Sequence, residues 1–180
     1  MIISVHGIEG SGKSYLLDKI NGNIIKKDTD DFSRLAYSDA YKNNKVNSRY
    51  INSRKKYYAN KFTEQNKGKF MVLVGMIKIK ADKYYYIDID LDNDYRRYIK
   101  REFNKFVDNA AKINRTISQS AVEDIPMNIQ LCAGSSNNCI LTIVDYAKMY
   151  NDDVELHSHC EIKTQKNIIK DINALVKINS

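Results

Sequence analysis

The sequence predicts an α/β fold in which helices cover both faces of a parallel sheet. Short apolar segments bounded by turn residues alternate along the 180 residues with longer segments whose apolar residues recur at helical spacing. Parallel strands need helical crossovers and are buried on both faces. Because no repeat, linker or low-complexity tract divides the chain, we expect one domain over residues 1–180.

The amino-terminal third is expected to begin with a strand, a helix and a second strand. Residues 1–6 are short and apolar and precede a glycine-rich turn, which is typical of a buried strand. Over 13–20 the apolar residues have helical spacing, and the helix should end near Gly22. Residues 23–27 are the second expected strand, followed by the acidic cluster 28–31.

The rest of the chain continues the alternation. Expected strands are 70–75, 84–89 and a last short one at 154–157. Expected helices are two within 32–67, separated near 43–44, a basic amphipathic one over 93–113, one beginning near 140 and a final one from about 161. Residues 115–138 lack periodicity, and we expect loops there.

Charge and composition restrict the function classes. The net charge is +7, from 29 basic and 22 acidic side chains, which suits a polyanionic ligand such as a nucleotide or a nucleic acid. Neither a signal peptide nor an apolar run long enough for a bilayer occurs, so we expect no membrane partner. Three cysteines favour a reducing compartment, and the predicted location is cytoplasmic. The bias toward Lys, Asn, Ile and Tyr suggests an AT-rich, viral source, in which case the location is the host cytoplasm.

Residues 7–14, GIEGSGKS, match the phosphate-binding pattern G-x-x-x-x-G-K-[ST] at every fixed position. Glycines let successive backbone N–H groups turn into one concavity, and the following helix adds its positive end. Lys13 should reach the terminal phosphates and Ser14 should hold Mg²⁺. The sequence therefore predicts ATP and Mg²⁺ as cofactors. The expected binding residues are Gly7, Glu9, Gly10, Ser11, Gly12, Lys13, Ser14 and Tyr15.

Three segments resemble the P-loop kinases of the adenylate kinase, shikimate kinase and nucleoside kinase kind. They are the opening IISVHGIEGSGKS, the acidic DTDDF at 28–32, and ADKYYYIDIDLDNDYRRYIKREF at 81–103, which looks like a strand running into an arginine-bearing lid helix. The resemblance covers about the first 110 residues. It implies a three-layer αβα P-loop NTPase fold with a central five-stranded parallel sheet and the P-loop strand in the middle.

A kinase must place an acceptor hydroxyl in line with the γ-phosphate and neutralise the transferring charge. Asp30 is our predicted base and second magnesium contact, with Asp28 or Asp31 assisting, although Asp30 or Asp31 would also serve as a helix cap. Arg97 and Arg101 lie four apart on one expected helix face and are the predicted catalytic arginines, with a solvated basic face as the alternative.

Two features depart from the pattern of deoxynucleoside kinases and many P-loop proteins. Gly75 ends the strand 70–75 where many P-loop proteins carry a magnesium-holding aspartate, although its small size would admit a substrate. No Asp-Arg-Ser or Glu-Arg-Ser triplet of the kind that deoxynucleoside kinases use is present. Asp88 and Asp90 mimic the missing aspartate, but their place before the arginine helix favours a structural or lid-hinge role.

Other clusters are less specific. His157, His159 and Cys160, with Cys132 and Cys139, include zinc-ligand types, but their irregular spacing favours packing and an exposed turn. The turn at 157–159 is also a candidate for adenine contact. Tyrosines interleaved with basic residues across 37–58 suit either a nucleotide or single-strand site or an ordinary amphipathic surface.

The sequence thus favours an ATP-dependent kinase acting on a nucleoside, a nucleotide or a similar small hydroxyl acceptor. The alternatives are a polynucleotide-end kinase, for which nucleic acid is the partner, and a nucleotide-binding regulator without efficient transfer. The sequence does not indicate an oligomeric state.

Overall fold

Five strands form one parallel sheet in the order β2-β3-β1-β4-β5. They are β1 (Ile2–His6), β2 (Ile25–Asp28), β3 (Met71–Val74), β4 (Lys83–Asp88) and β5 (Glu161–Thr164). Every pairing is parallel, so all five carboxyl ends meet at one edge. The strand before the P-loop, β1, is central, as expected. Strand β3 is fully buried, which explains its continuous apolar sequence, and β1 is buried from Ile3 to His6.

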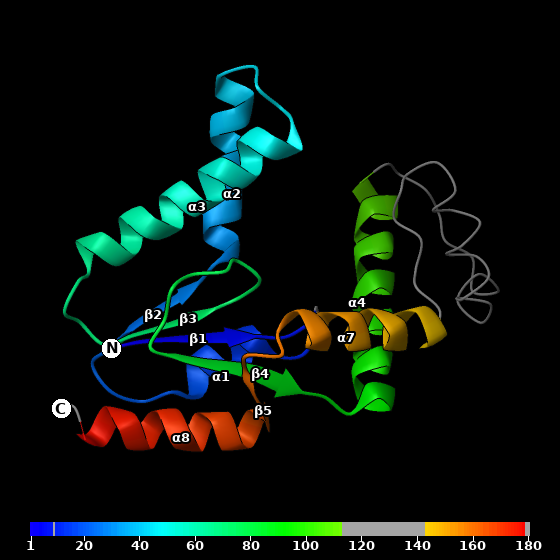
Figure 1. The fold of residues 1–180 in the computed structure, drawn as a ribbon. Helices are drawn as coiled ribbons and strands as arrows, with labels where there is room; N and C mark the ends of the chain where they lie inside the picture. The colour runs from blue at the N-terminus through cyan, green and yellow to red at the C-terminus, as the bar shows by residue number, and fades with distance from the viewer. Residues whose placement is uncertain (9, 113–142, 179–180) are drawn as a thin grey trace. The chain divides into compact units, whose positions relative to one another are not determined.

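The structure is a computed structural model that describes residues 1–8, 10–112 and 143–178 (Figure 1). The chain divides into two compact units, Met1–Asp88 with Asp153–Ser180 and Ile89–Asp152. The first unit contains the whole sheet, and the second is inserted between β4 and β5. The expectation of a single domain remains a prediction that an unfolding experiment can test.

Helices cover both faces of the sheet in the first unit. The helices are α1 (Lys13–Lys19), α2 (Asp30–Lys42), α3 (Ser48–Gln65), α4 (Leu91–Lys112), α7 (Ile143–Leu156) and α8 (Gln165–Ile178). Helices α1 and α8 lie below the sheet in Figure 1 and α3 lies above it. Phe32 of α2 and Ala59 of α3 share a buried cluster with Met71 and Leu73 of β3. None of the helices in the described ranges has the length and apolar character needed to cross a bilayer.

Tyrosines form the interior of the second unit. Tyr146 of α7 is fully buried, and its ring centroid lies 5.1 Å from that of Tyr98 and 5.6 Å from that of Tyr95, both on α4. Asp90 accepts a hydrogen bond from the Asn93 backbone N–H at the start of α4, which lowers the pKa of Asp90. Asp90 therefore makes a local contact at the start of α4.

The last strand lies later than predicted. Residues 154–156, expected in a strand, continue α7, and the His157 N–H donates to the Asp153 carbonyl to close the final turn. The true last strand, β5, has Ile162 as its one large apolar residue and pairs with β4 at the sheet edge. Because edge pairing needs little apolar burial, hydrophobicity did not reveal it. The final helix consequently starts at Gln165. The loops expected at 115–138 lie outside the described residues.

Candidate nucleotide-binding site

The P-loop connects the end of β1 to the start of α1, at the sheet edge where ligands bind in open α/β folds. The Ser11 N–H donates to the Ile8 carbonyl over 3.2 Å and closes the turn. Gly10 and Gly12 have φ values of 93° and 83°, a left-handed conformation that favours glycine. Glu9 lies outside the described residues.

The loop leaves donors suited to an anion. Gly12 is the N-cap of α1 and supplies no side-chain cap, so the first helical N–H groups need another partner. The Ser11 hydroxyl is buried and has no hydrogen-bond partner among the described residues. A phosphate group would satisfy both requirements, so these residues fit a nucleotide.

Lys13 places its ammonium group against the loop. Its Nζ donates to the Gly7 carbonyl over 2.6 Å and to the Ile8 carbonyl over 2.7 Å. The positive charge is therefore held beside the backbone amides by two carbonyl groups. Phosphate oxygens are stronger, charged acceptors for the same ammonium.

The hydroxyl of Ser14 donates to the Asp28 carboxylate over 3.2 Å, which joins α1 to the end of β2. The other Asp28 oxygen accepts the Asp30 N–H over 2.9 Å and so caps α2. A hydroxyl and a carboxylate are hard oxygen ligands, which Mg²⁺ prefers. The residues therefore fit a magnesium site made by Ser14 and Asp28.

Asp30 and Asp31 have different surroundings. Asp30 is exposed in the first turn of α2 and takes part in none of the ion pairs found within the described ranges. Asp31 accepts from Lys27 over 2.5 Å and from Arg34 over 3.0 Å. The Lys27 hydrogen bond lowers the pKa of Asp31. Asp31 is thus engaged in structure, whereas Asp30 can meet a substrate.

Gly75, at the end of β3, is pressed against Thr29. A Cβ on Gly75 would overlap the Thr29 Oγ1, and the φ of Gly75, 136°, is one that side chains rarely adopt. An aspartate cannot occupy this position without moving the start of α2. Asp28, on the adjacent strand β2, is the carboxylate that the structure brings to Ser14 instead.

Comparison with known proteins bears on the fold. No protein-family model matches the sequence, and no curated protein is detectably similar to it. The chain is similar to shikimate kinase from Bacteroides thetaiotaomicron, with a TM-score of 0.53 and 10% identity over 98% of both chains. It also matches thymidylate kinase from Ehrlichia chaffeensis, with 18% identity over 71% of this chain and 97% of that chain, at a TM-score of 0.37. The chain has the P-loop kinase fold.

Two contacts that no sequence motif predicts lie at this edge of the sheet: one holds the P-loop, and the other joins the end of β1 to the residue after β3. The Gln165 amide, at the start of α8, donates to the Gly12 carbonyl over 2.6 Å. The His6 Nδ1–H donates to the Gly75 carbonyl over 2.9 Å, and its Nε2 accepts from the Ser4 hydroxyl over 3.0 Å. Neither contact has a sequence motif, because each depends on the sheet order.

The predicted catalytic arginines belong to the second unit. Arg97 forms an ion pair with the buried carboxylate of Asp94, and Arg101 pairs with Glu102 over 3.2 Å. Both arginines therefore have acidic neighbours on α4 itself. Their action on a phosphoryl group at the P-loop stays a prediction.

The remaining candidates are placed as follows. Tyr15 is about half exposed, with the Lys19 ammonium 5.1 Å from its ring centroid. His157 is buried with its ring centroid 4.6 Å from that of His6, whereas His159 is exposed. The described residues contain no group of three ligands that could hold a metal ion, and Cys132 and Cys139 lie outside them.

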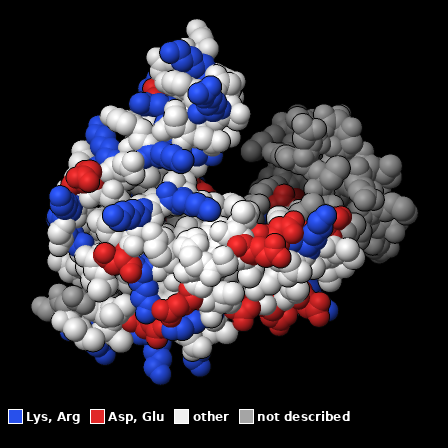
Figure 2. All heavy atoms as spheres, viewed as in Figure 1, with Lys and Arg blue, Asp and Glu red and all other residues white. Residues whose placement is uncertain are grey.

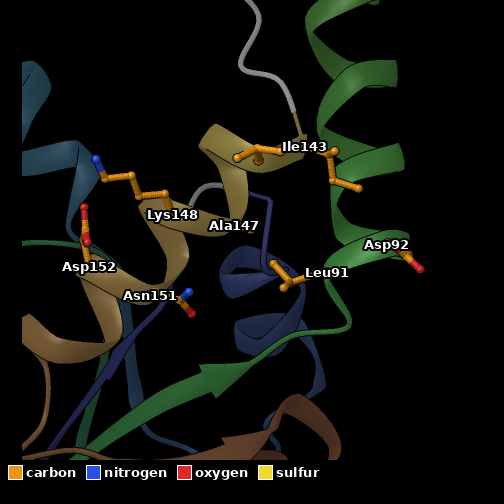
Figure 3. A pocket seen from close by; sticks show the side chains of 8 residues that line it. Leu91, Asp92, Ile143, Ala147, Lys148, Asn151 and Asp152 are labelled. Atoms are coloured by element: carbon orange, nitrogen blue, oxygen red, sulfur yellow. The ribbon is translucent and has the colours of Figure 1, made fainter.

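The second unit has a hollow of about 580 Å³ beside the first turn of α4 (Figure 3). Two of its lining residues come from α4 and six from α7: Leu91, Asp92, Ile143, Val144, Ala147, Lys148, Asn151 and Asp152. None of the predicted site residues lines it.

Proposed function

We propose that this chain is an ATP-dependent kinase that transfers the γ-phosphoryl group to a hydroxyl acceptor. The observation that carries the proposal is the pairing of a complete P-loop with a carboxylate at the same sheet edge, through the Ser14–Asp28 hydrogen bond. The P-loop kinase fold is consistent with it. The named activity of the similar structure, a shikimate kinase, supports the class of reaction and leaves the acceptor open.

Each group at the edge has a distinct task. Backbone amides from Gly10 to Ser14 and the Lys13 ammonium bind the phosphates. Ser14 and Asp28 would hold Mg²⁺, which would neutralise part of the charge that develops during transfer. Asp30, which the sequence suggested as the second magnesium contact, is not a ligand in this scheme. Its carboxylate is exposed beside Asp28 and orients the acceptor.

The transfer balances as a displacement at phosphorus. The acceptor oxygen forms a bond to the γ-phosphorus while the bond from that phosphorus to the bridging oxygen of ADP breaks, and ADP leaves with the electron pair. The hydroxyl proton passes to the carboxylate of Asp30. We propose that Arg97 and Arg101 donate hydrogen bonds to the transferring group.

Lys13→Ala tests the assignment. With ATP, Mg²⁺ and a panel of hydroxyl acceptors, the wild-type protein should form ADP faster than without acceptor, and Lys13→Ala should lose this difference. Lys166→Ala on α8 is the matched control and should behave as wild type. Acceptor-dependent ADP formation that survives Lys13→Ala would contradict the mechanism.

The two aspartates can be separated by conservative variants. Asp28→Asn keeps an oxygen that caps α2 but weakens a magnesium ligand, so it should raise the Mg²⁺ concentration needed for half-maximal activity. Asp30→Asn should lower kcat while leaving ATP affinity within about twofold. If Asp28→Asn instead lowered kcat and Asp30→Asn raised the Mg²⁺ requirement, the two roles would be exchanged.

A nucleotide-binding regulator is the second candidate, and the missing carboxylate at Gly75 favours it. This candidate predicts that ATP raises the melting temperature while ADP formation stays at background across the whole panel. The same samples decide between the two functions.

A further inference from the structure

The α2–α3 hairpin, residues Asp30–Gln65, carries an unusual surface. The segment that begins with Lys42 and ends with Lys61 contains seven basic residues, these two included, and no acidic one. Figure 2 shows lysines and arginines spread over this hairpin. Three of its tyrosines, at positions 37, 41 and 57, expose 46%, 67% and 46% of their surface.

Part of this composition is structural and explains nothing about a ligand. Arg54 forms an ion pair with Asp39 and lies over the rings of Tyr57 and Tyr58, and the Tyr50 hydroxyl donates to Asp39. These contacts tie α3 to α2. Tyr37 and Tyr41 take part in none of these contacts.

Tyr37 and Tyr41 lie one helical turn apart on α2, so their rings share a side of the helix. The Lys55 ammonium of α3 lies 5.5 Å from the Tyr37 ring centroid. We call these three residues the tyrosine face. Exposed rings beside ammonium groups can stack on bases while the lysines meet the backbone phosphates, which is how single-stranded nucleic acid is bound without sequence preference.

The tyrosine face is connected to the phosphoryl-transfer edge. Helix α2 starts at Asp30, immediately after the Asp28 that bonds Ser14, and Phe32 and Ala59 fix the hairpin to β3. At 1.5 Å per residue, α2 is about 20 Å long, enough for a few nucleotides to follow it.

We propose that the acceptor is the hydroxyl end of a single-stranded nucleic acid held by the tyrosine face and the basic residues of the hairpin. This inference rests on the proposed kinase function and names its substrate class. A duplex presents its phosphates but keeps its bases stacked, so it cannot use the exposed rings.

The test measures fluorescence anisotropy of a labelled single-stranded oligonucleotide with the full chain. We expect salt-sensitive binding, at least about tenfold weaker for Tyr37→Ala/Tyr41→Ala and within about twofold of wild type for Tyr37→Phe/Tyr41→Phe, which keeps both rings. Lys55→Gln/Lys56→Gln should reduce the slope of log K against log salt by roughly 1.4. Lys166→Gln/Lys170→Gln on α8 makes the same charge change away from the hairpin and should leave binding unchanged.

Activity completes the test. ATP and Mg²⁺ should place phosphate on a hydroxyl-ended oligonucleotide and not on a free nucleoside. No binding, equal affinity for a matched duplex, or binding unaffected by the alanine pair would overturn the inference. If ATP still raised the melting temperature and a small acceptor were phosphorylated, the kinase proposal would stand without it. Loss of ATP binding in the wild type would remove both.

Discussion

At the scale of single residues, the close approach of Gly75 to Thr29 excludes a side chain at the end of β3. Gly75→Ala should lower the free energy of unfolding by about 3 kcal/mol, because its Cβ would collide with the Thr29 hydroxyl and its φ is positive. Gly68→Ala is the matched control, since φ is 84° there but a Cβ would meet open space. It should cost only about 1 kcal/mol. Equal losses in chemical denaturation would show that the Thr29 contact is unimportant.

His6 is the second residue with a measurable consequence. Burial, together with the nearby His157 and His159, lowers the pKa of His6 to about 4. The hydrogen bond to Gly75 and the charge of Asp153 oppose this shift. Between that value and the ordinary 6.5, the unfolded chain binds a proton that the folded chain does not. The free energy of unfolding should therefore fall as the pH falls, by roughly 2 kcal/mol from pH 7 to pH 5.

The His6 effect is isolated by comparison with His6→Gln, which cannot take up that proton. Urea denaturation at pH 7 and pH 5 should show that the variant loses less unfolding free energy than the wild type, by roughly 2 kcal/mol. Parallel losses in the two proteins would mean that His6 titrates normally in the fold.

At the scale of elements, α8 is amphipathic and packs on the sheet through its buried side chains. Ile172 is fully buried, whereas Ile178 on the same helix is 80% exposed. Ile172→Ala should cost about 3 kcal/mol of stability through the lost burial and the cavity left behind. Ile178→Ala should stay within about 0.5 kcal/mol of wild type. Similar losses for both variants would indicate that α8 is not docked as described.

Elements also show what the sequence could predict. The strand before the P-loop and the helix after it were predictable, since buried strands are apolar and glycine marks the turn. Strand β5 was not, because Glu161 and Lys163 are satisfied by ion pairs at an exposed edge. Within the site, Lys13 and Ser14 follow from the motif. Which aspartate meets Ser14 depends on α2 starting at Asp30, and local pattern does not fix that boundary to one residue.

At the scale of the whole molecule, chain order couples the two units. The first unit is discontinuous: β5 pairs with β4 only after the 64 residues from Ile89 to Asp152 have been traversed. Helix α7, Ile143–Leu156, begins in the second unit and ends in the first. Helix formation is cooperative, so melting one end of α7 destabilises the other. The sheet therefore depends on the segment that follows the insertion.

We accordingly expect one cooperative thermal transition, with equal calorimetric and van't Hoff enthalpies. ATP with Mg²⁺ at a hundred times its dissociation constant should move that whole transition upward, since binding adds about 2.7 kcal/mol to the folded state. Lys13→Ala should keep the single transition and lose the shift, which separates ligand binding from folding. Two resolved transitions, of which ATP moves one, would show that residues 89–152 unfold independently and that the chain comprises two domains.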